Sequence, residues 1–212
     1  MEKIKIGISS CLLGNQVRYN GGHTRDRFIT DTMGSYCEFV PVCPEVECGL
    51  PIPRDSMRLV GDVENPRLIT TKTHIDQTER MKSWMKKRLE ELAAEDLVAY
   101  IFKTKSPSSG LRSVKVYSES GNVVSYKGQG MFARGFTGRF PDIPVEDEGR
   151  LHDPGIRENF IETIFVLQRW RNGARDGGPG KLVEFHSRHK YTLMAHGPEG
   201  LRKMGKIVAR VG

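Results

Sequence analysis

Two thiols, three hydroxyls and one carboxylate lie just beyond strand-like runs in this sequence. Cys11 comes directly after the run KIKIGISS, and Cys43 follows CEFVPV, with Glu45 two residues further on. A third run, LVAYIF, leads into a loop that holds Ser106, Ser108 and Ser109. Alternating, β-branched runs of this kind predict β-strands. Ligands bind beyond the carboxyl ends of strands in open parallel sheets, so we expect the six side chains to share one pocket.

The thiols of this predicted pocket suggest a metal. Thiolates bind soft metals, including zinc and the iron of iron–sulfur clusters. Cys11 and Cys43 are too few for either, and Cys48 is a candidate third ligand. Cys37 begins its strand, so we expect it at the opposite end of the sheet as a buried small hydrophobe. Small residues at strand ends also form tight turns without any chemistry, and the residues alone leave that interpretation open.

The elements that would position these groups alternate between strand and helix. The stretch DRFITDTMGSY predicts a short helix between the first two strands. Apolar residues three and four apart over 75–92 predict a longer helix, which Asp76 and Glu79 would open as a capping box. The alternation predicts an α/β fold, Rossmann-like, with a largely parallel sheet flanked by helices. VKVYSESGNVVSY predicts a hairpin that turns at 118–122 and adds an edge to this sheet.

The composition changes at Gly128, where glycine and proline become frequent. We expect a helix-poor linker from there to about residue 149. The predicted domains are therefore an α/β domain with its linker over 1–149 and a smaller, all-α domain over 150–212.

The second predicted domain contains three helices. Asp153 as N-cap, Pro154 at the first position and Gly173 as the stop delimit the first of them. The other two are predicted over 181–196 and 198–208.

The basic charge of the chain is concentrated in this second domain. The net charge is +7, and residues 150–212 hold 12 Lys and Arg against 6 Asp and Glu, whereas 1–149 hold 21 against 20. An electropositive segment on a near-neutral body indicates a polyanionic partner, RNA or DNA before a membrane. The alternative is a basic helical tail that only aids solubility. No apolar run is long enough for a membrane span or a signal peptide, so we expect a cytoplasmic protein.

Three histidines fall in the second domain at positions 186, 189 and 196. They could bind a metal, but no acidic or thiol side chain accompanies them at a suitable spacing. Arg188 and Lys190 lie beside them, so we expect the histidines to face a phosphate backbone or the domain junction. Flipped or single-stranded bases are bound by aromatic rings and arginine, which would suit delivery of one base to the pocket.

Several of these segments resemble a known family. SSCLLGNQVRYNGGH, VCPEVECGLPIPR and KSPSSG resemble the three signatures of the iron–sulfur thiouracil desulfidases. GRLHDPGIRENFIETIF followed by FHSRHKYTLMAH is similar to the domain fused to them in RNA 4-thiouridine desulfidases. That fused domain usually continues well past the position of Gly212, so the resemblance implies a truncated or naturally abbreviated form here.

The resemblance implies a [4Fe–4S] cluster with three protein ligands and one open iron. The ligand positions match Cys11, Cys43 and Ser109, and family members carry cysteine at the third of them. A serine hydroxyl is a poorer iron ligand than a thiolate. The chain therefore holds a cluster with Ser109 or Cys48 as third ligand, or holds none.

The resemblance also implies an activity. Glu45 and Ser106 match the family's acid–base candidates, although the residues alone favour Glu45 as a carboxylate that caps backbone donors. The implied reaction removes sulfur from 4-thiouridine in tRNA, with water as co-substrate and uridine and sulfide as products. Its alternatives are an inactive RNA-binding relative and a desulfidase of free thiouracil. No obligatory protein partner is expected. The RNA contacts would be Arg169, Arg171, Arg188 and Lys190.

Overall fold

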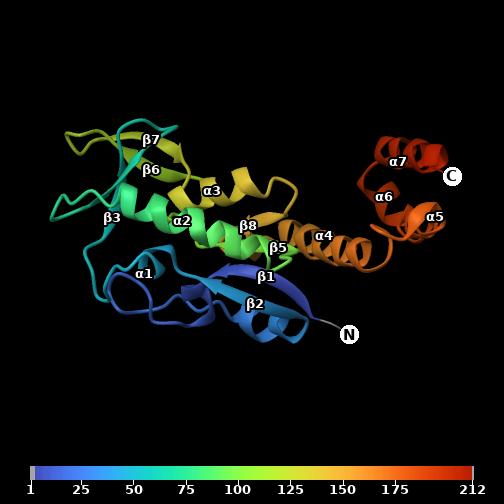
Figure 1. Cartoon of the computed structure of the whole chain (residues 1–212), viewed down its shortest axis with the longest axis horizontal. Helices are drawn as coiled ribbons and strands as arrows, with labels where there is room; N and C mark the ends of the chain where they lie inside the picture. Colours follow the sequence, from blue (N-terminus) through green and yellow to red (C-terminus); the bar gives the residue numbers. More distant parts are fainter. Residues whose placement is uncertain (1–2, 212) are drawn as a thin grey trace. The chain divides into compact units, whose positions relative to one another are not determined.

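The computed structural model describes residues 3–211 of the chain, which divides into two compact units, Met1–Phe160 and Ile161–Gly212 (Figure 1). Among the described residues, no helix is both long and apolar enough to cross a membrane.

A parallel sheet forms the centre of the first unit. Its strands run in the order β2-β1-β5-β8, and every neighbouring pair is parallel. All four residues of the third strand are buried, as expected where both faces of a parallel sheet are covered. The strands are β1 (Ile4–Ser9), β2 (Cys37–Val42), β5 (Ala99–Phe102) and β8 (Val145–Asp147). The predicted α/β fold with a largely parallel sheet and a helical C-terminal part is confirmed.

A second sheet was not predicted. Its order is β4-β3-β6-β7, with β3 parallel to β6 and the two outer pairs antiparallel. The predicted hairpin is present, and Ser118 N donates to Asn122 O at 2.7 Å across its turn. Its predicted place at the edge of the parallel sheet is wrong, because it pairs with β3 instead. The strands are β3 (Met57–Val60), β4 (Arg67–Thr70), β6 (Val114–Tyr117) and β7 (Val123–Gly128).

The helices between the strands are only partly as predicted. The long predicted helix is α2 (Thr78–Ala93), where Asp76 Oδ1 accepts Thr78 N at 2.8 Å. Glu79 pairs with Lys82 rather than completing a capping box. Instead of a short α-helix, residues 28–35 form one π turn and one 3₁₀ turn.

The expectation of a helix-poor linker over 128–149 is wrong. This stretch contains helix α3 (Met131–Arg139) as well as β8. Gly135 of α3 serves packing, because a Cβ there would clash with Met85 Sδ of α2. Burial of Phe132 and Phe136 therefore outweighs the low helix propensity of glycine.

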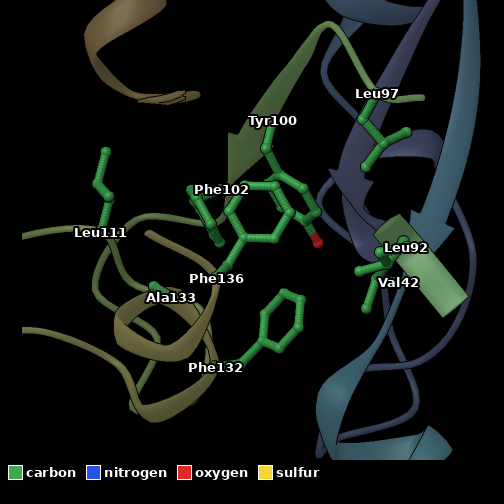
Figure 2. Packing of buried hydrophobic residues seen from close by; sticks show 9 residues of the cluster. All are labelled: Val42, Leu92, Leu97, Tyr100, Phe102, Leu111, Phe132, Ala133 and Phe136. Carbon is green, nitrogen blue, oxygen red and sulfur yellow. The ribbon is translucent and has the colours of Figure 1, made fainter. Parts of the chain in front are cut away.

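An aromatic core joins β5 to α3. Tyr100 and Phe102 project from the same face of β5, and their rings meet Phe132 and Phe136 of α3 with centroids 4.6 to 6.3 Å apart. Figure 2 shows these side chains from the strand and the helix gathered in one cluster with Leu92 of α2. The core thus fixes the two elements that flank the serine loop at residues 106–109.

Four helices follow β8, and the first of them, α4, begins in the first unit and continues into the second. Asp153 Oδ1 accepts Ile156 N at 3.0 Å, so the predicted N-cap of α4 is confirmed. The helix predicted over 181–196 is in fact two helices, which break at His189. The helices are α4 (Pro154–Gly173), α5 (Gly178–Arg188), α6 (Lys190–His196) and α7 (Pro198–Val211).

Candidate active site

A cavity of about 370 Å³ opens where the carboxyl ends of β1, β2 and β5 meet. All six side chains singled out in the sequence line it: Cys11, Cys43, Glu45, Ser106, Ser108 and Ser109. The structure therefore brings them together at the place that a parallel sheet favours for ligands.

The two thiols enter the cavity from two short turns. Cys11 lies in the 3₁₀ turn after β1, where its carbonyl accepts Gly14 N at 3.3 Å and Thr24 N at 3.0 Å. Gly14 closes this turn with a φ of 97°, which suits glycine. Cys43 precedes α1 (Pro44–Glu47), and its Sγ lies 3.8 Å from Val17 O.

Burial sets the protonation of both thiols. It raises the pKa of Cys43 to about 11 and that of Cys11 above its ordinary value. The Thr24 hydroxyl and the charges of Lys103 and Arg18 oppose the rise in the pKa of Cys11. Both groups are therefore thiols at neutral pH, and a metal cation that binds them must displace their protons.

The other two cysteines lie elsewhere. Cys48 Sγ donates to Glu45 O at 3.2 Å, and the described lining of the cavity does not include it. Cys37 starts β2 at the opposite end from Cys43, and burial raises its pKa to about 11. Across residues 3–211, no three His, Cys, Asp or Glu side chains are grouped to hold a metal ion. The cavity offers two thiols and, at Ser109, a hydroxyl.

A directed chain of hydrogen bonds connects the serine loop to Glu45. Ser108 Oγ donates to Glu45 Oε1 at 2.8 Å, and Ser106 Oγ lies 3.0 Å from Ser108 Oγ. A serine hydroxyl has one proton, so Ser106 must be the donor to Ser108. Ser109 N donates in turn to Ser106 Oγ at 3.1 Å. The hydroxyl proton of Ser106 is therefore the first in a series of two hydrogen bonds that ends at the Glu45 carboxylate.

Arg54 fixes the other oxygen of that carboxylate. Its Nε and Nη2 donate to Glu45 Oε2 at 2.8 and 2.5 Å, and Nη2 also donates to Val17 O at 2.9 Å. The arginine side chain is only 5% exposed, so these charge-assisted bonds are well shielded from water. Sequence reasoning missed Arg54, which stands nine residues from Glu45 in the segment VCPEVECGLPIPR.

Helix α3 holds the serine loop in place. Its first amides donate to loop carbonyls: Met131 N to Pro107 O at 3.1 Å and Phe132 N to Ser108 O at 2.9 Å. These are the amides that a helix start leaves without partners. Gly130 allows the close approach, because a Cβ there would lie 2.6 Å from Ser108 O. The stretch predicted as a linker is thus the support of the site.

A second pair of charges borders the cavity. Lys103 Nζ forms an ion pair with Glu148, whose other oxygen accepts Thr104 N at 2.6 Å. Neither residue was predicted from the sequence. Glu148 directly follows β8, but β8 itself was not predicted, so the position of Glu148 at a strand end could not be recognised.

The predicted RNA-binding residues lie in the second unit and have varied surroundings. Arg169 Nε donates to His189 Nε2 at 3.0 Å, so the imidazole proton is on Nδ1, which faces Phe185 O. Arg188 pairs with Glu184 at 2.7 Å. Lys190 is exposed and Arg171 is partly buried.

The histidines of the second unit have separate environments. His196 contacts Glu162 at 2.7 Å, whereas His186 Nε2 is buried without a hydrogen-bond partner among residues 3–211. The expectation that the histidines face a phosphate backbone or the domain junction stays a prediction.

Fold and site define a class: an α/β protein with a thiol- and serine-lined cavity at the ends of parallel strands. A family model of 2-thiouracil desulfurases matches residues 6–148. The chain therefore belongs to the 2-thiouracil desulfurase family, and the resemblance of its N-terminal segments to the thiouracil desulfidases is confirmed. The similarity of the C-terminal segments to the domain fused in RNA 4-thiouridine desulfidases stays a prediction.

Two known proteins are similar to this chain. The uncharacterized protein YbbK of Bacillus subtilis (strain 168) is 31% identical over 126 residues, which are 57% of this chain and 83% of YbbK. Among solved structures, the [4Fe–4S]-dependent thiouracil desulfidase TudS is 28% identical with a TM-score of 0.56. That match covers 74% of this chain and 99% of TudS.

Proposed function

We propose that this chain is a [4Fe–4S]-dependent desulfidase that converts 4-thiouridine in tRNA to uridine, with water as co-substrate and sulfide as product. One observation carries the proposal. The same cavity is lined by two thiols and by a chain of hydrogen bonds that runs from Ser106 through Ser108 to Glu45. Membership of the 2-thiouracil desulfurase family and the likeness to TudS support it.

Cys11 and Cys43 would hold the cluster, with Ser109 at the third ligand position. When bound, the cluster supplies a Lewis-acidic iron for the thiocarbonyl sulfur. The donor set fits this role at two positions, because both thiols line the cavity. The donor set fits less well at the third position, since the hydroxyl of Ser109 is a weaker iron ligand than a thiolate. We therefore expect this chain to retain a cluster less well than a variant with a third cysteine.

The chain's own residues would manage the protons. The proton of Ser106 passes to Ser108 Oγ while that of Ser108 passes to Glu45 Oε1, and Ser106 Oγ then takes a proton from the attacking water. The water oxygen bonds to the base carbon, and reversal of the relay returns the first proton to the sulfur. The carbon–sulfur bond then breaks as the new hydroxyl releases its remaining proton to solvent, which leaves a carbonyl and hydrosulfide. Arg54 keeps Glu45 Oε2 occupied and so directs Oε1 to Ser108.

The basic second unit supports tRNA as the substrate. Residues 161–212 hold 10 Lys and Arg against 4 Asp and Glu. Four of these cations are exposed on α7: Arg202, Lys203, Lys206 and Arg210. Such a stripe is typical of a surface that meets a phosphate backbone. Free thiouracil is a second candidate substrate, because TudS acts on thiouracil by its name. The remaining candidate, an RNA-binding relative without activity, is favoured by Ser109 alone.

Anaerobic reconstitution of the unaltered chain and of Ser109→Cys tests the proposal. We expect about tenfold or more iron and sulfide to be retained by the variant, because a thiolate binds iron better than a hydroxyl. We also expect the variant to consume the 4-thiouridine of tRNA, followed by its absorbance. Cys48→Ala is the matched control and should change neither result, since Cys48 lies outside the cavity lining. A Ser109→Cys protein without iron would refute the proposal, and turnover of free thiobase alone would establish the second candidate.

A further inference from the structure

The second sheet has an outer face that carries two cation–aromatic pairs. The Arg58 guanidinium of β3 lies 5.4 Å from the ring centroid of Tyr117, and Lys115 Nζ lies 5.7 Å from that of Tyr126. Lys115 and Tyr117 are two residues apart on β6, so their side chains project from the same side of the sheet. The two pairs therefore share one surface, which spans β3, β6 and β7 (Figure 1).

This outer face is separate from the cavity. Met57 lines the cavity, and Arg58 is the next residue of β3, so its side chain points to the opposite side of the sheet. None of the four paired side chains belongs to the described lining of the cavity. Val114 and Val116, which alternate with the outward residues of β6, are buried in the core. The sheet thus turns an apolar face inward and a cationic, aromatic face outward.

The positive charges of the two pairs are not balanced by the protein. Arg58 and Lys115 form no ion pair with any carboxylate of residues 3–211. Arg67 of the adjacent strand β4, in contrast, pairs with both Glu119 and Asp76. Arg58 Nε is also buried without a hydrogen-bond partner among these residues, which is uncommon for a buried donor. An external anion beside this guanidinium would offset the unbalanced charge through charge-assisted hydrogen bonds.

The rings of the outer face suit the flat faces of nucleobases. Tyr126 is 64% exposed, and Val124, two residues earlier on β7, is 54% exposed. Isolated exposed apolar residues are common on proteins, but here each ring is paired with an unbalanced cation on a neighbouring strand. Single-stranded nucleic acids are bound by such surfaces, with bases stacked on the rings and phosphates near the cations. A duplex keeps its bases stacked on each other and would leave the rings without contacts.

We propose that the outer face of the second sheet binds single-stranded RNA, with bases stacked on Tyr117 and Tyr126 and phosphates paired with Arg58 and Lys115. This inference rests on the proposed function and adds to it an RNA contact in the first unit, outside the cavity. An unpaired segment of tRNA bound there is held by the unit that contains the reacting groups. Every base has a flat π-face, so we expect little sequence preference.

A tryptophan on this face reports stacking directly. The variant Tyr126→Trp is titrated at low salt with an unthiolated oligouridylate of about eight nucleotides. We expect saturable quenching of its added fluorescence, after subtraction of the signal from the unaltered protein, because a stacked base quenches indole emission. The quenching should weaken as salt rises, and a duplex of the same length should cause none. The matched control is Tyr36→Trp, because Tyr36 is 61% exposed but lies outside the second sheet, and its emission should stay constant.

Removal of the cations tests the other half of the proposal. In the Tyr126→Trp background, Arg58→Gln combined with Lys115→Gln should weaken binding of the oligouridylate about tenfold, because two phosphate contacts are lost. The control in the same background is Lys86→Gln, which removes an exposed lysine of α2 and should leave the affinity unchanged. An equal affinity in the double variant would contradict the assigned role of the two cations.

The remaining outcomes separate this inference from the proposed function. No quenching at position 126, equal quenching at position 36, or equal quenching by the duplex would each overturn the inference. Emission that changes with protein concentration in the absence of RNA would also overturn it, and would indicate that a second copy of the chain covers this face. Turnover of 4-thiouridine in tRNA without quenching would leave the proposed function in place. Quenching in a reconstituted Ser109→Cys protein without turnover would overturn the proposed function alone.

Discussion

Charged side chains are paired at the strand ends of the first unit but unpaired with described carboxylates on α7 of the second. At the strand ends of the first unit, Glu45 and Arg54 are paired and largely buried, and Lys103 is paired with Glu148. On α7 of the second unit, the basic side chains are exposed, and none forms an ion pair with a described carboxylate. Paired, buried charges hold individual atoms in place, as proton transfer requires. Exposed charges of one sign supply attraction without fixed geometry, which is sufficient for a polyanion.

Removal of the carboxylate should have the largest effect. In the Ser109→Cys background, Glu45→Gln eliminates the end of the proton path, so we expect kcat to fall about 100-fold to 10,000-fold. The iron content should stay the same, because Glu45 is not among the proposed ligands. Single-turnover kinetics and iron analysis check both. Glu38→Gln, an exposed carboxylate of β2, is the control, and similar loss there would contradict the role of Glu45.

The relay should be the next most sensitive point. In the same background, Ser108→Ala breaks the connection between Ser106 and Glu45, and we expect kcat to fall about tenfold to 100-fold with little change in KM. Ser108→Thr keeps a hydroxyl and should recover part of the loss. Steady-state kinetics of the two variants distinguish a proton path from a purely structural serine. Equal losses in both variants would indicate that the hydroxyl itself is not needed.

Charge removal on α7 should give a smaller and more gradual effect. Replacement of Arg202, Lys206 and Arg210 by Gln removes three exposed cations, so the KM for tRNA should rise several-fold relative to that for the free nucleoside. The salt dependence of tRNA binding should become less steep, because fewer counterions are released. Filter-binding titrations at two salt concentrations measure this. An unchanged slope would mean that α7 is solvated surface only.

The smallest expected effect concerns Asp147 at the end of β8. Burial raises its pKa from 3.8 to about 6, against the opposing influence of Leu111 N and Arg112. Its neutral form therefore stabilises the fold below pH 4, and this contribution is lost as the pH rises through 6. Asp147→Asn does not titrate, so its Tm relative to the unaltered chain should increase by a few degrees between pH 4 and 7. Thermal unfolding at several pH values checks this, and a constant difference would contradict it.

The strand ends could be predicted because their signal is local. Each run is β-branched and apolar, and each is followed at once by Cys11, Cys43 or the serine loop. The parallel arrangement then brings these ends together without further information. The strands β3 and β4, with the sequences MRLV and RLIT, gave no comparable signal, because each contains an arginine and only one Val or Ile.

Contacts that depend on side-chain direction could not be predicted. Cys48 is close to Cys43 in sequence, yet its Sγ points to Glu45 O outside the cavity lining. Arg54 reaches Glu45 only because the chain turns back over residues 49–53. Helix α3 was missed because Gly135 and Gly138 lower its propensity, and only packing against α2 and β5 reveals why it forms.

The backbone hydrogen bonds that hold the serine loop against α3 do not depend on the side chain at position 109. The loop is held by its carbonyls and by Gly110 N, which donates to Ser106 O at 2.7 Å, and the Ser109 side chain takes no part in these bonds. The side chain at position 109 can therefore change between a hydroxyl and a thiol without altering the backbone that shapes the pocket. Under the proposed function, the single substitution Ser109→Cys would complete a set of three thiols.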